Sequence, residues 1–169
     1  IRSQMGGNLE AMAKSVATAK QFGMELSEVA AAGKSMLNFH SSIEAELEAE
    51  LFLGKQLNLE QARLAALTGD YDTLMKEINK NVGNFYDFSK LNVMQQDKLA
   101  AAMGMTSDQL SDQLLKKADL NALTKEARED GREDIAANME RLSIQDKIEA
   151  SMEKFKASMA DILTVLNPI

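Results

Sequence analysis

The chain has 169 residues, 45% of them hydrophobic, and a formal net charge of −7 with a pI near 4.8. This acidity argues against direct nucleic-acid binding, because affinity for a phosphate backbone comes from clustered Lys and Arg. Cys is absent, which excludes disulfides and thiolate metal sites, and no apolar run approaches the roughly 20 residues that a membrane span requires.

The composition predicts an all-α fold, either a helical bundle or an elongated string of helical hairpins. Ala, Leu, Met, Glu, Lys, Gln and Asp dominate, whereas aromatic residues make up 5% and there is one Pro. With so few aromatic side chains, Leu, Ile and the 11 Met must fill the core.

Residues 1–53 are predicted to form long amphipathic helices. The first carries apolar residues at alternating spacings of four and three, which is typical of a packing seam, and ends at Gly23. Its seam consists of Met5, Leu9, Met12, Val16 and Ala19. Ser27 opens a second helix, which we expect to continue to about Leu51 with one face formed by Val29, Met36, Ile43 and Leu47.

Residues 54–104 are predicted to form a module of short helices. Gly54 breaks the chain, Asn58 caps a helix that Gly69 closes, and Asp70 begins another, which together give an αα-hairpin. The aromatic cluster of Phe85, Tyr86 and Phe88 follows in a connector, before Asn92 caps the next helix.

Residues 105–169 are predicted to be C-terminal helices. One runs from Thr106 to about Lys117, and another starts at Asp119 or Thr124 and continues past Gly131. Ser143 is expected to open the last helix, a long amphipathic one that Pro168 ends. Its coiled-coil-like seam, matching the one at the other end of the chain, consists of Ile148, Met152, Phe155, Met159, Ile162 and Leu166.

The residues that could carry chemistry form no recognisable site. His40 and Glu44, one helical turn apart, are too few to hold a metal, and we expect His40 to be a buried or interfacial histidine. Glu46 and Glu50 are expected to lie on a solvated helix face. Without a nucleophile motif or a complete cation loop, we expect no catalytic residue, no metal and no cofactor.

We expect the apolar seams to provide helix-packing interfaces. Any one seam could pack within the chain, or it could form contacts between copies in a homo-oligomer. The first and last helices are the favoured candidates for contacts between copies. The predicted interface residues are Leu47, Leu51, Ile148, Phe155, Met159 and Ile162. The chain begins at Ile1 and ends at Ile169, and we expect it to be part of a longer protein.

Three stretches of the sequence resemble tail tape measure proteins of tailed bacteriophages. They are SSIEAELEAELFLGKQLNLEQARLAALTGDYDTLMKEI from Ser41, KLNVMQQDKLAAAMGM from Lys90, and the ending LSIQDKIEASMEKFKASMADILTVLNPI. Together they cover about half of the chain. The resemblance implies a structural protein of the virion tail, assembled in the host cytoplasm, which packs against tail tube and baseplate hub proteins and helps to set tail length.

The sequence leaves other functions open. A helical scaffold or chaperone-like module that binds a partner helix through a Met-rich groove would have the same composition. An accessory hydrolase domain would depend on Glu48 or Glu50. Membrane contact after ejection from the tail would be at most interfacial, because the apolar stretch from Ile162 to Leu166 is short.

Overall fold

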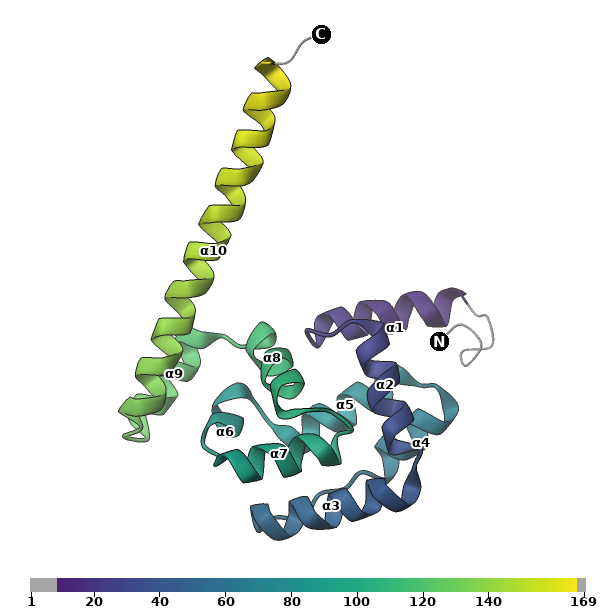
Figure 1. Ribbon diagram of the computed structural model, residues 1–169. Helices are drawn as coiled ribbons and strands as arrows, with labels where there is room; N and C mark the ends of the chain where they lie inside the picture. Colours follow the sequence, from purple (N-terminus) through teal and green to yellow (C-terminus); the bar gives the residue numbers. More distant parts are fainter. Residues whose placement is uncertain (1–8, 167–169) are drawn as a thin grey trace. The chain divides into compact units, whose positions relative to one another are not determined.

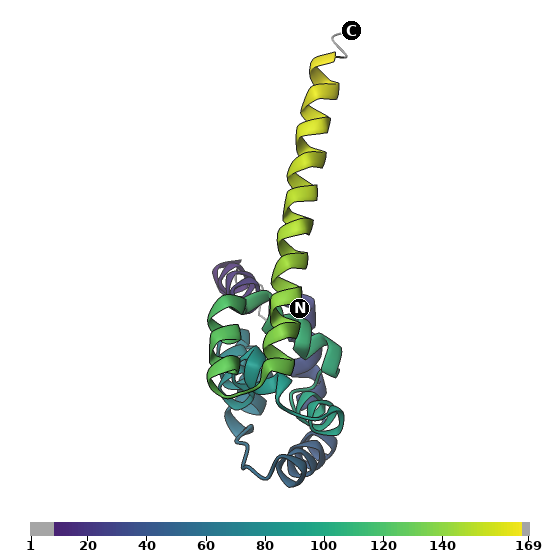
Figure 2. The same ribbon diagram turned by 90° about the vertical axis from the view of Figure 1, so that its left-hand side faces the viewer.

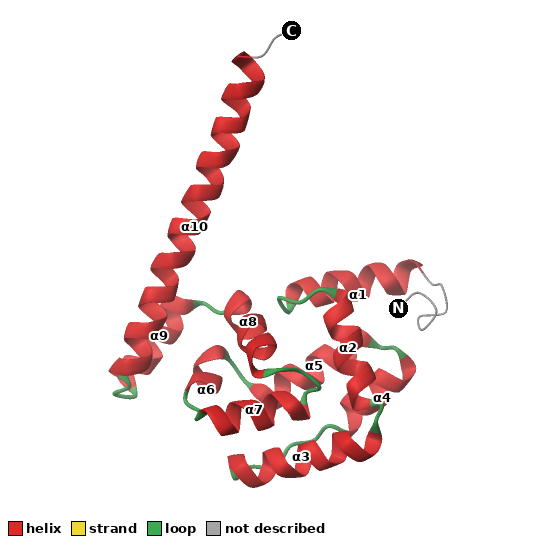
Figure 3. Cartoon of the chain, in the orientation of Figure 1, coloured by secondary structure: helices red, strands yellow, loops and turns green. Residues whose placement is uncertain are grey.

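Helices account for all of the regular secondary structure in the part of the chain that is described. The computed structural model describes the backbone of residues 9–166 and the side chains of residue 10 and residues 12–160. Over that range there are ten helices and no strand, which confirms the predicted all-α class (Figures 1 and 3). The helices are α1 (Leu9–Gln21), α2 (Leu26–Met36), α3 (Phe39–Leu53), α4 (Glu60–Thr68), α5 (Tyr71–Val82), α6 (Phe85–Ser89), α7 (Val93–Ala102), α8 (Ser107–Lys117), α9 (Leu120–Glu129) and α10 (Glu133–Leu166).

The chain divides into two compact units, with the boundary between Ala118 and Asp119. Unit 1 contains α1–α8 and unit 2 contains α9 and α10. The predicted division at 53/54 therefore falls inside unit 1, where α3 packs along α7 and α2 packs on α4. The predicted boundary at 104/105 lies one helix before the observed one.

Local sequence signals set most helix boundaries in unit 1. Gly54 and Gly69 adopt the left-handed conformation, with φ of 65° and 72°, and end α3 and α4 as predicted. Asp70 caps α5 by accepting a hydrogen bond from the Thr73 N–H at 3.1 Å. Asn92 and Thr106 form reciprocal capping boxes at the starts of α7 and α8. The helix after Gly54 begins at Glu60 with Leu59 as its N-cap, so the predicted cap at Asn58 is wrong.

The prediction of one long helix from Ser27 to about Leu51 is wrong. The chain breaks at Leu37 and Asn38, and Asn38 becomes the N-cap of α3. On either side of the break the buried faces meet different partners, because α2 packs on α4 and α5 whereas α3 packs along α7. A straight helix would hold one face toward one partner, so tertiary packing favours two helices here.

The core of unit 1 is rich in methionine and contains the predicted aromatic cluster. Phe85, Tyr86 and Phe88 lie on the short helix α6, and each is at most 7% exposed. The buried methionines of this unit are Met24, Met36, Met75, Met103 and Met105. The first helix joins this core through Ser15, Thr18 and Ala19, so part of the predicted α1 seam packs within the unit.

Unit 2 is a helical hairpin whose second helix is much longer than the first. Gly131, with φ of 73°, turns the chain between α9 and α10. It was predicted to lie within a helix, which is wrong. Helix α10 then runs without interruption through Ser143, so the predicted start at Ser143 is also wrong. Apolar residues join the two helices: Leu120, Leu123 and Ala127 of α9, and Ile135, Ala136 and Met139 of α10.

Candidate helix-packing surfaces

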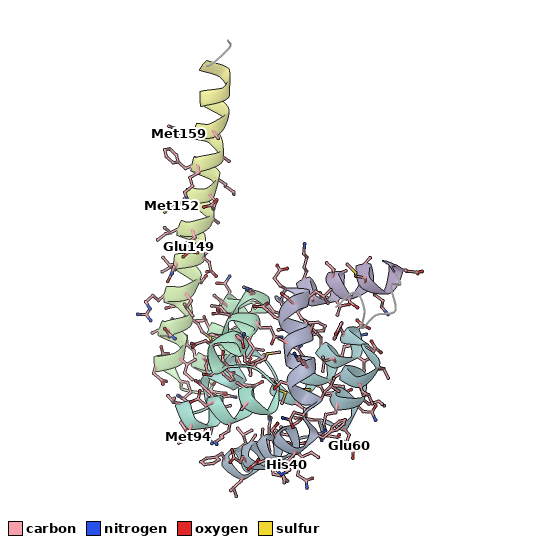
Figure 4. The ribbon with its side chains drawn as sticks, turned by 45° about the vertical axis from the view of Figure 1, so that its right-hand side comes forward. His40, Glu60, Met94, Glu149, Met152 and Met159 are labelled. Atoms are coloured by element: carbon pink, nitrogen blue, oxygen red, sulfur yellow. The ribbon has the colours of Figure 1, made fainter. Side chains whose placement is uncertain are left out.

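The second half of α10 has no packing partner within unit 2, as far as that unit is described. Every side chain from Ile144 to Ala160 is exposed, whereas the first turns of the helix lie against α9. Figures 1 and 2 show α10 continuing well beyond the end of α9 as a single helix. Met152 and Met159 lie on this unaccompanied part (Figure 4). A helix of this length gains most of its stability from packing, so this exposed part is the first candidate interface.

The apolar residues of the exposed half form one continuous stripe. At about 100° per residue, they fall within an arc of about 80° on the helix surface. The stripe consists of Ile144, Ile148, Met152, Phe155 and Met159, and their exposed fractions are 58%, 55%, 55%, 67% and 43%. We call this set the α10 stripe.

The α10 stripe is separate from the face that packs on α9. Ile135, Met139 and Leu142 belong to the α9 side, and the helical repeat places them roughly half a turn around the helix from the stripe. Helix α10 therefore has two apolar faces that point in nearly opposite directions. The α9 face is covered, whereas the stripe is uncovered within unit 2.

A second apolar surface lies on the outer side of α3 in unit 1. Ile43, Leu47 and Leu51 are 45%, 60% and 80% exposed and follow one another at intervals of four residues. With His40, Glu44 and Glu48 they line a shallow groove, which we call the α3 groove. The opposite side of α3 carries the buried residues Ser42, Glu46 and Ala49, which hold the helix against the rest of the unit.

His40 lies at the rim of the α3 groove and is not buried. Its side chain is 92% exposed, and Nδ1 lies 3.8 Å from a carboxylate oxygen of Glu44 (Figure 4 shows His40 on α3). The prediction that His40 is buried is therefore wrong. No group of three or more His, Cys, Asp or Glu side chains that could hold a metal ion is found among the described residues.

The acidic residues of α3 separate into two pairs with different roles. Glu44 and Glu48 face solvent beside the groove, and Glu48 accepts a charge-assisted hydrogen bond from Lys98 at 2.5 Å. Glu46 and Glu50 face inward and accept hydrogen bonds from the backbone N–H groups of Leu59 and Leu57. The prediction of a solvated face for Glu46 and Glu50 is thus wrong, because the chain after Gly54 returns over them.

The predicted interface residues lie on both candidate surfaces. Leu47 and Leu51 belong to the α3 groove, and Ile148, Phe155 and Met159 belong to the α10 stripe. Ile162 lies within α10, but its side chain is outside the described residues. Sequence reasoning omitted Ile144 from the interface, although its position four residues before Ile148 extends the same seam.

Electrostatic contacts elsewhere in the protein tie helices together. The Thr18 hydroxyl of α1 donates to the Asp72 carboxylate of α5 at 2.8 Å, and Lys76 donates to the same group at 2.7 Å. These hydrogen bonds lower the pKa of Asp72 below its ordinary value, and the one from Lys76 has the larger effect.

Among the described residues, none of the helices is long and apolar enough to cross a membrane.

Comparison of the chain with protein-family models, with curated proteins and with solved structures gives no significant match.

Proposed function

We propose that this chain is a structural, non-catalytic segment of a phage tail tape measure protein that works by packing its helices against other tail components. The packing role rests on the α10 stripe, because a long uncovered apolar face on a helix is typical of an interaction surface. The resemblance of residues 41–78, 90–105 and 142–169 to tape measure proteins supplies the setting, which is the tail tube or the baseplate hub.

The two units suggest different roles within such a protein. Unit 1 is built from helices of 5 to 15 residues that pack on one another, so it is a folded module rather than an extended ruler. Helix α10 has 34 residues and, at 1.5 Å per residue, is about 50 Å long. We propose that α10 is the only part of this chain that contributes to tail length. Unit 1 would instead serve as a junction or hub-binding module.

The test is an in-frame deletion of the codons for these residues in the genome that encodes them, followed by electron microscopy of the virions. We expect tails that fail to assemble or to infect, or tails shortened by no more than about 50 Å. Virions with unaltered tails and full infectivity would contradict a role in the tail.

The packing role can be tested separately on the purified chain. Met159→Asp places a carboxylate at the C-terminal end of the α10 stripe, where Met159 is 43% exposed and is not part of the core of unit 2. We expect the substitution to lower the oligomer mass measured by light scattering and to leave the folding of both units unchanged. An unaltered mass would refute packing through this stripe.

A second candidate function is a scaffold or chaperone-like module, and the α3 groove favours it. The groove is apolar along Ile43, Leu47 and Leu51 and lies on a unit that is compact by itself. Such a module would bind a helix of an unrelated partner and would itself remain monomeric. The oligomeric mass of the purified chain therefore distinguishes the two candidates.

A further inference from the structure

We infer that the two apolar surfaces are each other's partners between copies: the α10 stripe of one copy docks into the α3 groove of another. This inference rests on the proposed packing function and names the partner of the stripe. It makes the contact heterologous, because the two surfaces that meet are different and each copy keeps one of each free. Association of this kind leads to a ring or an open chain of copies.

The first argument is shape. The α3 groove presents Ile43, Leu47 and Leu51 at four-residue intervals, and the α10 stripe begins with Ile144, Ile148 and Met152 at the same interval. Rows at this spacing form ridges on a helix, and the ridges of two such helices interdigitate in the commonest mode of helix packing in globular proteins. Each row is uncovered within its own unit.

The second argument is charge. The groove beside the α10 stripe is lined by Lys147, and Lys154 lies seven residues further along the same edge of the helix. No carboxylate among the described residues lies within ion-pair distance of either lysine. The α3 groove carries Glu44 on its rim, and Glu48 beside it already accepts from Lys98. Docking would therefore bring the lysine edge against Glu44, which favours this pairing over others.

Pairing of two α10 stripes is a poorer match. In a parallel pair, the repeat of Ile148, Met152 and Phe155 would set Ile144 of one helix beside Glu149 of the other. The lysine edges would also find no acidic counterpart on each other. Placing an isoleucine beside a carboxylate and leaving the lysines without counter-charges would add little binding free energy. The α3 groove is therefore the better partner.

The contact joins two single-helix faces and is therefore at the low end of the size range of specific interfaces, so we expect reversible association that grows with concentration. Sedimentation velocity of the full chain should show a mass that rises with concentration. A wild-type chain that stays monomeric at all accessible concentrations would overturn the inference.

Two single substitutions separate the surfaces. Leu47→Asp inactivates the α3 groove, and Phe155→Asp inactivates the α10 stripe; both residues are exposed, at 60% and 67%, so neither change disturbs a core. We expect each variant alone to be monomeric. An equimolar mixture should form a dimer, because one copy supplies an intact stripe and the other an intact groove. Val93→Asp is the matched control, since Val93 is 74% exposed outside the groove and should leave association unchanged.

The outcomes distinguish this inference from the proposed function. If Phe155→Asp abolishes association and Leu47→Asp does not, α10 pairs with itself or binds elsewhere; the inference then fails while packing through the stripe stands. If neither substitution changes the association, both fail. A mixture that remains monomeric also overturns the inference.

Charge reversal tests the register of the two edges. Lys147→Glu should weaken association roughly two- to five-fold, the range for an exposed ion pair. Mixing the Lys147→Glu chain with the Glu44→Lys chain should recover the lost affinity. Lys125→Glu on α9, whose lysine is 80% exposed, is the control and should have no effect. Failure of the mixture to recover would place the lysine edge away from Glu44.

Discussion

Glu46 of α3 and Arg63 of α4 form a salt bridge of 2.6 Å inside unit 1, with side chains that are only 12% and 10% exposed. The second Glu46 oxygen accepts from the Leu59 N–H at 2.9 Å, and Arg63 also donates to the Ser42 hydroxyl at 3.3 Å. The pair thereby fixes the chain after Gly54 against the inner side of α3. This is the side opposite the α3 groove, so the pair also holds the groove outward.

We expect Glu46→Ala to destabilise unit 1 by about 3 kcal/mol, because it leaves the Arg63 guanidinium buried without a counter-charge and the Leu59 N–H without an acceptor. Both tyrosines, Tyr71 and Tyr86, are buried in unit 1 and the chain has no Trp. Tyrosine fluorescence in a urea titration therefore reports on this unit.

The matched control for that measurement is Glu44→Ala, which removes an exposed carboxylate two residues away and should change the free energy of unfolding by less than about 0.5 kcal/mol. Arg63→Met in the Glu46→Ala background should recover part of the loss, because no buried charge remains. Equal effects of Glu46→Ala and Glu44→Ala would contradict a structural role for the pair.

The contact between α1 and α5 should be sensitive to acid. Hydrogen bonds from Lys76 and Thr18 lower the pKa of Asp72 below its ordinary value of 3.8. A lowered pKa means that the stabilisation is fully present above the ordinary value and is lost as the pH falls below it. Asp72→Ala should therefore cost about 1–2 kcal/mol at neutral pH and progressively less in acid.

A urea titration series between neutral pH and about pH 3 would measure this dependence. Thr18→Val removes one donor but keeps the Lys76 pair, so it should retain part of the acid dependence. A difference between wild type and Asp72→Ala that is independent of pH would show that the carboxylate acts by packing alone.

The turn of unit 2 depends on the backbone of Gly131. Its φ is 73°, and a Cβ built there would meet nothing within 4 Å, so the cost of Gly131→Ala is purely conformational. We expect a loss of about 1 kcal/mol in the stability of the α9–α10 hairpin, and a smaller loss for Gly131→Asn, because Asn tolerates the left-handed region. Hydrogen–deuterium exchange of residues 120–143 would detect it, whereas tyrosine fluorescence should not change.

A peptide of residues 144–166 should be only partly helical in isolation, because an amphipathic helix takes most of its stability from packing of its apolar face. Adding the full chain carrying Phe155→Asp, whose α3 groove is intact, should raise its far-UV circular dichroism helix signal. The chain carrying Leu47→Asp should not. Helix formation with both chains would point to a binding site other than the α3 groove.

The parts of the fold that could be predicted from sequence are those fixed by local chemistry. Gly54 and Gly69 permit a left-handed backbone, and Asn92 and Thr106 cap the next helix with their own side chains, so each signal lies within a few residues of its effect. The αα-hairpin between Gly54 and Gly83 follows from those signals, and α4 and α5 do pack together.

The parts that could not be predicted depend on residues distant in sequence. The break at Asn38 arises because α2 and α3 face different partners, and Glu46 is buried because Arg63 lies 17 residues away and returns to it. Gly131 was ambiguous, since a glycine near charged residues fits the middle of a helix as well as a turn. For the candidate site, four-three spacing identified the stripe but could not say which helix would cover it.

The exposure of α10 beyond Ser143 also bears on the fate of copies that have not assembled. A helix that is held by nothing opens frequently, and an open backbone is a substrate for proteases. In the association proposed above, single copies would thus be cleaved first along the stripe, whereas associated copies would keep it intact. Proteolysis would then remove the chains that have not associated.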